Sequence, residues 1–137
     1  MVRSFTYPIQ VYPHHTDYAG VVWHGAYVNW MEEVRVAFLD HQGLPYADIT
    51  AQDCDLMVVA LNLRYHRAAK MGESLLWYAT LHPLQGVRCI WDYELRSLDH
   101  TLLYVTAQVT IVPVNRKTGK LMRRWPPDLV SILCPPA

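Results

Sequence analysis

Titratable side chains gather in the segment HHTDYAGVVWHGAYVNWMEEVR, residues 14–35, where a loop gives way to a helical pattern. The loop contains Asp17 and His24, two residue types that transfer protons in active sites. The first N–H groups of a helix lack intrahelical partners and carry partial positive charge, so they can stabilise an oxyanion that develops nearby. The segment is therefore either an ordinary loop and helix cap or a catalytic loop that leads into a helix.

The helix that would present this loop is predicted at about residues 25–42. Its apolar side chains recur at helical spacing, at Tyr27, Trp30, Met31, Val34, Phe38 and Leu39. Gly43 and Pro45 follow them, which is typical of a helix end. One long amphipathic helix needs an apolar surface against which to pack.

Strand patterns supply that surface. One strand is predicted before the helix, at residues 5–12, and is ended by Pro13. After a short turn near residues 46–52, four more are predicted at residues 56–66, 74–82, 88–98 and 102–112. The tail PPDLVSILCPPA is expected to be a surface-packed end. This order predicts an α+β fold in which an antiparallel sheet of about five strands wraps around one central helix, in a single domain over residues 1–137.

Composition excludes several classes of protein. The chain has 12 basic and 12 acidic residues, whereas a dedicated nucleic-acid binder has a strong basic excess. Its three cysteines form no CxxC pair, which favours a reducing compartment. No apolar run has the length of a signal peptide or a membrane span. We therefore expect a cytoplasmic protein with neither nucleic acid nor membrane as a partner.

The element order and the segment TDYAGVVWHGAYVNWMEEVR together resemble the hotdog fold, in particular the 4-hydroxybenzoyl-CoA thioesterase-like family of acyl-CoA thioesterases. The residues in register with the family pattern are Thr16-Asp17, Gly20-Val21-Val22, His24, Tyr27, Glu32 and Arg35. The segments NLRYHRAAKMGESL and RKTGKLMRRWP are similar more weakly, so the likeness covers about residues 5–127. One departure is Pro13, which stands where some relatives have a tyrosine.

The resemblance implies hydrolysis of a thioester without a cofactor. Asp17 would act as general base on water or would itself attack the thioester carbon, and the sequence leaves that choice open. His24 would offer its backbone N–H to the carbonyl oxygen and its imidazole to the water. Gly20 and Gly25 would let the carbonyl approach the helix start closely.

Substrate contacts are also implied. Trp23 and Tyr27 could shape an acyl pocket, although core packing explains the aromatic residues more simply. Arg123 and Arg124 belong to five cations within residues 116–124, which suits the three phosphates of coenzyme A, while a solvated hairpin tip is the plainer interpretation. The expected substrate is an acyl-CoA or an acyl group on a carrier protein, with the acyl group left open.

Several alternatives accompany this prediction. Glu32 and Glu33 are the substitute carboxylates, because in another thioesterase subfamily the catalytic carboxylate comes from the helix. Glu32 and Arg35 are spaced for an ion pair. The histidines and aspartate of residues 14–24 lack the spacing of metal ligands, so no metal is expected. A non-catalytic acyl-binding hotdog protein is the main functional alternative, and a hotdog dehydratase or hydratase matches the motif less well.

A homo-oligomer is expected as well. A lone hotdog sheet has long edge strands, and unpaired edges invite pairing with another chain. In the family the site lies between subunits. The expected assembly is a homodimer or a homotetramer.

Overall fold

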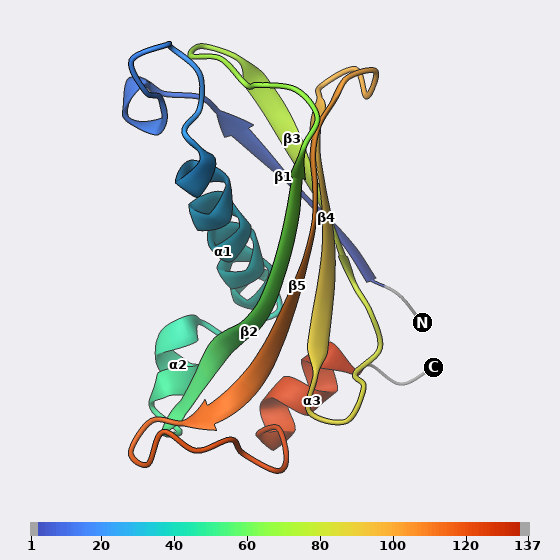
Figure 1. Ribbon diagram of the computed structural model, residues 1–137. Helices are drawn as coiled ribbons and strands as arrows, with labels where there is room; N and C mark the ends of the chain where they lie inside the picture. Colours follow the sequence, from blue (N-terminus) through green and yellow to red (C-terminus); the bar gives the residue numbers. More distant parts are fainter. Residues whose placement is uncertain (1–2, 135–137) are drawn as a thin grey trace.

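A five-stranded antiparallel sheet wraps around one long helix in this computed structural model, which describes residues 3–134 (Figure 1). The elements follow in the order β1 (Arg3–Gln10), a 3₁₀ turn (Pro13–His15), α1 (His24–His41), α2 (Tyr46–Thr50), β2 (Cys54–Tyr65), β3 (Ser74–Leu81), β4 (Cys89–Ser97), β5 (Leu103–Asn115) and α3 (Pro127–Leu133). The predicted α+β hotdog architecture is confirmed. The helix and the strands begin and end within about three residues of their predicted bounds.

The strands are hydrogen-bonded in the order β1-β3-β4-β5-β2, so β1 and β2 are the two edges of the sheet. A meander of β3, β4 and β5 occupies the centre, because short connections join strands that are consecutive in the chain. The strand that precedes the helix lies on one edge. The strand that follows the helix lies on the other.

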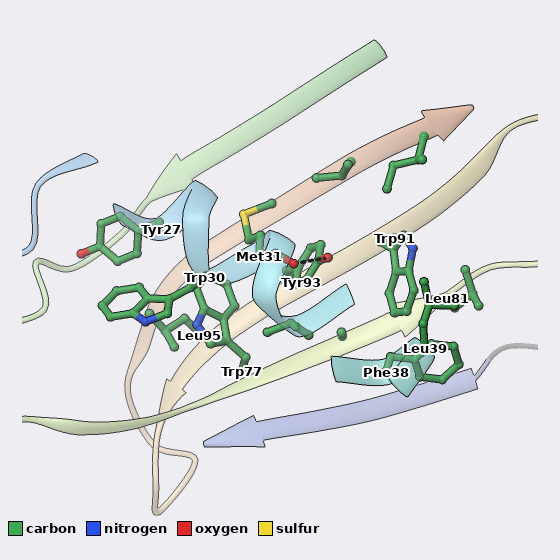
Figure 2. Packing of buried hydrophobic residues seen from close by; sticks show 14 of the residues in the cluster. Tyr27, Trp30, Met31, Phe38, Leu39, Trp77, Leu81, Trp91, Tyr93 and Leu95 are labelled. Carbon is green, nitrogen blue, oxygen red and sulfur yellow. Dashed lines mark hydrogen bonds between the residues drawn. The ribbon is translucent and has the colours of Figure 1, made fainter. Parts of the chain in front are cut away.

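The inner face of the sheet and the apolar stripe of α1 form the core (Figure 2). Every second side chain of β4 faces the core, with Cys89, Trp91, Tyr93 and Leu95 all buried. Tyr93 reaches α1, where its hydroxyl donates a hydrogen bond to the carbonyl oxygen of Met31 at 3.0 Å. A buried hydroxyl needs such a partner, and the bond ties the helix to the middle of the sheet.

The C-terminal segment, expected to be a surface-packed end, contains a helix that was not predicted, α3 at residues 127–133. Pro127 occupies the first turn, where proline is well tolerated. Leu129 and Leu133, one helical turn apart, are buried and cover the inner face beyond the end of α1. Residues 135–137 of the tail, like residues 1 and 2, lie outside the described part of the chain.

The edge strand β2 leaves apolar side chains in solvent. Met57, Val58, Val59 and Leu61 are each between 44% and 53% exposed. The register of β2 against β5 shifts between Val58 and Ala60, as a β-bulge does. Among residues 3–134, no helix is both long and apolar enough to cross a bilayer.

Candidate active site

The Asp17 loop, residues 16–23, is a tight hairpin ahead of α1. The N–H of Asp17 donates to the carbonyl of Val21 at 2.9 Å, and the N–H of Gly20 donates to the carbonyl of Asp17 at 3.1 Å. Gly20 has a φ of +77°, a conformation that other residues rarely adopt. Glycine at this position is thus required by the turn that presents Asp17.

Backbone hydrogen bonds fix the loop to its surroundings. The N–H of Val22 donates to the carbonyl of Ala69 at 2.9 Å, and the N–H of Met71 donates to the carbonyl of Gly20 at 3.2 Å. On its other side, the N–H of Trp23 donates to the carbonyl of His15 at 3.1 Å. The loop is exposed to solvent and yet held in place on two sides.

The side chain of Asp17 is exposed and only partly engaged. Its Oδ1 accepts a hydrogen bond from the N–H of Ala19 at 2.9 Å, which orients the carboxylate. No donor within residues 3–134 is hydrogen-bonded to Oδ2. One carboxylate oxygen is therefore available to a water or a substrate.

The start of α1 has no side-chain cap. Its N-cap residue is Trp23, whose indole makes no capping hydrogen bond. A Cβ added to Gly25 would lie 2.0 Å from Cζ3 of the Trp23 ring, so only glycine lets this indole lie against the first turn. Gly25 thus has a packing role in addition to the close approach of substrate expected from the sequence. The first N–H groups of α1 remain available as donors.

An open pocket of about 350 Å³ lies beside this helix start. Its lining includes His24 and Tyr27, and also three residues that sequence analysis did not single out, namely Tyr65, His66 and Arg67. Tyr65 comes from the end of β2, and its hydroxyl donates to the carbonyl of His24 at 3.1 Å. The end of the edge strand β2 therefore borders the first turn of α1.

Tyr27 is buried, and its hydroxyl accepts a hydrogen bond from the N–H of Ala69 at 3.3 Å. Burial raises the pKa of this hydroxyl. Trp23 lies toward a different hollow, which it shares with His15 and Trp30. Of the two aromatic residues expected at the substrate, only Tyr27 borders the pocket beside His24.

His14 and His15 lie against neighbouring aromatic rings. Nδ1 of His15 accepts the N–H of Tyr12 at 2.9 Å, and the ring of His15 lies 4.4 Å from that of Trp30. Burial, and then the charge of His14, lower the pKa of His15. Among residues 3–134, no group of three or more His, Cys, Asp or Glu side chains is arranged to hold a metal ion.

The expected ion pair between Glu32 and Arg35 is not formed. Arg35 instead donates to the hydroxyl of Tyr93 at 3.2 Å, because its guanidinium points inward to the sheet rather than along the helix surface. Glu32 is exposed, and Glu33 lies near Tyr7, whose pKa rises through burial first and then through the hydrogen bond with Glu33. Neither glutamate lines the pocket beside His24.

Arg123 and Arg124 are exposed in the segment between β5 and α3. Figure 1 places this segment at the bottom of the molecule and the Asp17 loop at the top, at the two ends of α1. Lys117 of the same basic stretch is engaged by Asp53, with Nζ 3.4 Å from Oδ2. Within one chain, the two arginines and Asp17 are not brought together.

Several known proteins are similar to this chain. The family model of the thioesterase-like superfamily matches residues 11–133. A Synechocystis protein named provisionally as an esterase is 42% identical over 125 residues, which are 91% of this chain and 75% of that protein. An acyl-CoA thioester hydrolase of Escherichia coli is 26% identical over 111 residues, 81% of this chain and 82% of that protein. The crystal structure of a 1,4-dihydroxy-2-naphthoyl-CoA thioesterase from Synechocystis has a TM-score of 0.88 at 26% identity, with 97% of both chains covered.

Proposed function

The chain belongs to the thioesterase-like superfamily, and we propose that it hydrolyses an acyl-CoA thioester to the free acid and coenzyme A. The observation that supports this most directly is the placement of Asp17. Its carboxylate is oriented by its own loop, and one carboxylate oxygen accepts no hydrogen bond from residues 3–134. The same loop leads into the uncapped start of α1. Hydrolysis of a thioester needs this combination of a base and oxyanion donors.

In the proposed reaction Asp17 takes a proton from a water molecule as the water oxygen attacks the thioester carbon. The first N–H groups of α1, including that of His24, donate to the oxyanion that forms. The intermediate then collapses, the C–S bond breaks, and the proton is delivered to the sulfur of coenzyme A. In the alternative course, a carboxylate oxygen of Asp17 attacks the thioester carbon, the C–S bond breaks, and coenzyme A leaves as its thiolate. Water then hydrolyses the resulting anhydride and supplies the proton that the thiolate takes up.

The substrate would lie along the pocket beside His24 and Tyr27. Gly20 and Gly25 leave room for the carbonyl, since neither places a side chain over the donors. Trp23 borders the opposite side of the helix start and would flank the substrate there. The imidazole of His24 is exposed and can hold the attacking water.

A second copy of the chain would complete the site. The edge strand β2 offers unpaired backbone groups and exposed apolar side chains, which favour pairing with another strand. One end of β2 borders His24 through Tyr65, and the other end reaches Asp53 and the basic stretch. Antiparallel pairing of two β2 strands about a two-fold axis would therefore set the basic stretch of one subunit near the Asp17 loop of the other. We propose a homodimer of this kind, or a homotetramer built from it.

Arg123 and Arg124 would then bind phosphate groups of coenzyme A. Both are exposed, and neither forms an ion pair with a carboxylate of residues 3–134. Their guanidinium groups match the geometry of phosphate oxygens. An acyl group on a carrier protein is the other thioester that this arrangement would accept. The compartment we propose is the cytoplasm.

A non-catalytic acyl-binding protein is the competing function. One observation favours it, because Oδ1 of Asp17 already serves its own loop through Ala19, as in an ordinary structural turn. The test is release of free thiol from a panel of acyl-CoAs by the purified wild-type protein, with binding of the same compounds measured by calorimetry. Turnover supports the hydrolase, whereas tight binding of several acyl-CoAs with no thiol release would support the binding protein.

A further inference from the structure

Residues 66–73, which connect β2 to β3, pack against both parts of the candidate active site. The N–H of Val22 donates to the carbonyl of Ala69 at 2.9 Å, which joins this connection to the Asp17 loop. The N–H of Ala69 in turn donates to the hydroxyl of Tyr27, in the first turn of α1, at 3.3 Å. The conformation of the connection therefore sets where the Asp17 loop lies relative to the N–H groups at the start of α1.

The side chain of Glu73 holds the connection in this conformation. One carboxylate oxygen, Oε1, accepts a hydrogen bond from the N–H of Lys70 at 2.7 Å. The other, Oε2, accepts a hydrogen bond from the hydroxyl of Tyr104 on β5 at 2.6 Å. Lys70 pairs with Val21 in a β-bridge, and the carbonyl of Val21 accepts the N–H of Asp17 at 2.9 Å. The Glu73 carboxylate is thus linked to the proposed base through the backbones of Lys70 and Val21.

Tyr104 anchors this carboxylate to the sheet. Its side chain is buried on β5, an interior strand, and its pKa is raised by burial first and then by the hydrogen bond to Glu73. The hydroxyl therefore stays protonated at neutral pH, and a buried donor needs an acceptor. The backbone of Glu73 is held separately, because the N–H of Val11 donates to its carbonyl at 2.9 Å. A change of the Glu73 side chain therefore leaves that backbone pairing in place.

We propose that Glu73 is a positioning residue for thioester hydrolysis, which sets the relation between Asp17 and the oxyanion donors of α1. The proposal rests on the proposed function, since it takes Asp17 as the base. Glu73 does not line the pocket beside His24, so it acts without touching the substrate. A base and its donors act on one carbonyl group, and a misplacement of about 1 Å can slow such a reaction about a hundredfold. Loss of the Glu73 carboxylate should therefore appear in kcat rather than in KM.

Amide hydrogen exchange tests this positioning without any turnover. Glu73→Gln keeps the size of the side chain but has one acceptor oxygen, so either the Lys70 N–H or the Tyr104 hydroxyl loses its acceptor. The N–H of Val22, which is bonded directly to the connection, should then exchange about tenfold faster than in wild type.

Glu94→Gln is the matched control, because it makes the same chemical change to a glutamate with both oxygens engaged. Arg96 donates to Oε1 of Glu94 at 3.2 Å and to Oε2 at 3.1 Å, on the outer face of β4. Glu94 makes no hydrogen bond with the Asp17 loop or with residues 66–73 of the chain. The exchange of the Val22 N–H and kcat should both be unchanged in Glu94→Gln.

Turnover measures the consequence for catalysis. In thiol release from the best substrate of the acyl-CoA panel, Glu73→Gln should lower kcat about tenfold to a hundredfold, with KM changed by less than about threefold. Tyr104→Phe removes one of the two donors and should lower kcat about three- to tenfold. The double variant should be no slower than Glu73→Gln alone, because both changes act through the same hydrogen bond.

The two measurements separate the possible failures. If the Val22 exchange responds as expected but wild type hydrolyses no acyl-CoA, the proposed function is wrong and the role of Glu73 in holding the Asp17 loop stands. If thioesters are hydrolysed and folded Glu73→Gln has the kcat of wild type, the positioning proposal is wrong. A fall in kcat that matches the loss of folded protein by circular dichroism, with the Val22 exchange unchanged, would also overturn it. If Glu73→Gln does not fold, Tyr104→Phe decides, and wild-type kcat and exchange in that variant would refute the proposal.

Discussion

The two ends of α1 have opposite characters. At its N-terminal end lie an exposed carboxylate, an exposed histidine and an open pocket of about 350 Å³. Toward its C-terminal end lies a narrower, mostly apolar cavity of about 120 Å³. Proton transfer to and from water needs access to solvent, whereas selection of an acyl group needs a closed space with few polar partners. Within one chain, α1 therefore separates an open pocket from a narrower, mostly apolar cavity.

That separation is too large for one small substrate to bridge along the helix. The 18 residues of α1 span about 27 Å at 1.5 Å per residue. Antiparallel pairing of two β2 strands, as proposed, would shorten this separation. It would set the C-terminal end of one α1 near the N-terminal end of the other. The dimer proposed from the exposed side chains of β2 would therefore bring the two regions together.

The largest expected effect comes from the N-terminal end of α1. Asp17→Asn keeps the shape of the side chain but removes the base and the nucleophile, and should lower kcat by about 10² to 10⁴. Asp40→Asn makes the same chemical change to an exposed carboxylate at the C-terminal end of the helix and should leave kcat unchanged. Both variants are assayed for thiol release after circular dichroism and sedimentation have confirmed fold and assembly. Near wild-type turnover by Asp17→Asn would contradict the role of Asp17 and make Glu32 and Glu33 the next candidates for the catalytic carboxylate.

The next effect concerns the edge strand that would join the two ends. Val59→Lys places a charge on the exposed apolar stretch of β2, and two such charges brought together across a dimer cost several kcal/mol. Sedimentation should show a monomer, and activity should fall by about 10² because the site is incomplete. Thr6→Lys makes an equivalent change on β1, the opposite edge, and should preserve both assembly and activity. A fully active monomer would refute the shared site.

His24 allows a finer distinction at the same end of the helix. His24→Ala removes the imidazole but keeps the backbone N–H, so it should cost less than Asp17→Asn, about tenfold in kcat if the ring positions the water. Single-turnover measurements separate this chemical step from product release. A loss as large as that of Asp17→Asn would give the imidazole a direct part in catalysis, and no loss would leave only the backbone N–H.

The basic stretch should affect binding rather than chemistry. Arg123→Ala combined with Arg124→Ala should raise KM for an acyl-CoA about three- to thirtyfold, since exposed ion pairs are worth up to about 1 kcal/mol each, with kcat changed less. The salt dependence of KM should weaken as well. Lys117→Ala is the control, because Asp53 already engages that ammonium group. A KM that is unchanged across ionic strength would assign the two arginines to plain solvation.

The sequence predicts most of the fold because its strongest patterns are local. The strand at residues 88–98 and the helical spacing from Tyr27 to Leu39 each lie within one uninterrupted segment, and both are confirmed. The helix α3 was missed because Leu129 and Leu133 make only one helical repeat. The proline pair before Asp128 was the available signal, since proline at the first turn is typical of a helix start.

The part of the candidate site that lies in one continuous segment could also be predicted, because it depends on a local pattern. Residues 17–27 are consecutive, so Asp17, His24 and Tyr27 can be grouped without knowledge of the fold. Tyr65 reaches the site from β2, and its sequence distance of 41 residues from His24 hides that contact. The packing of Gly25 against Trp23 is equally invisible, because it depends on the direction of the indole ring.

Tyr65 should give the smallest of these effects. Its hydroxyl donates to the carbonyl of His24 at 3.1 Å and so helps to fix the first turn of α1, without being placed to react. Tyr65→Phe removes one exposed hydrogen bond, which predicts a loss of about two- to tenfold in kcat with little change in KM. Tyr78→Phe removes a hydroxyl that bonds His100, far from α1, and should leave both constants unchanged. Equal effects of the two variants would show that the β2 contact does not position the helix start, and would weaken the link between the edge strand and the Asp17 loop.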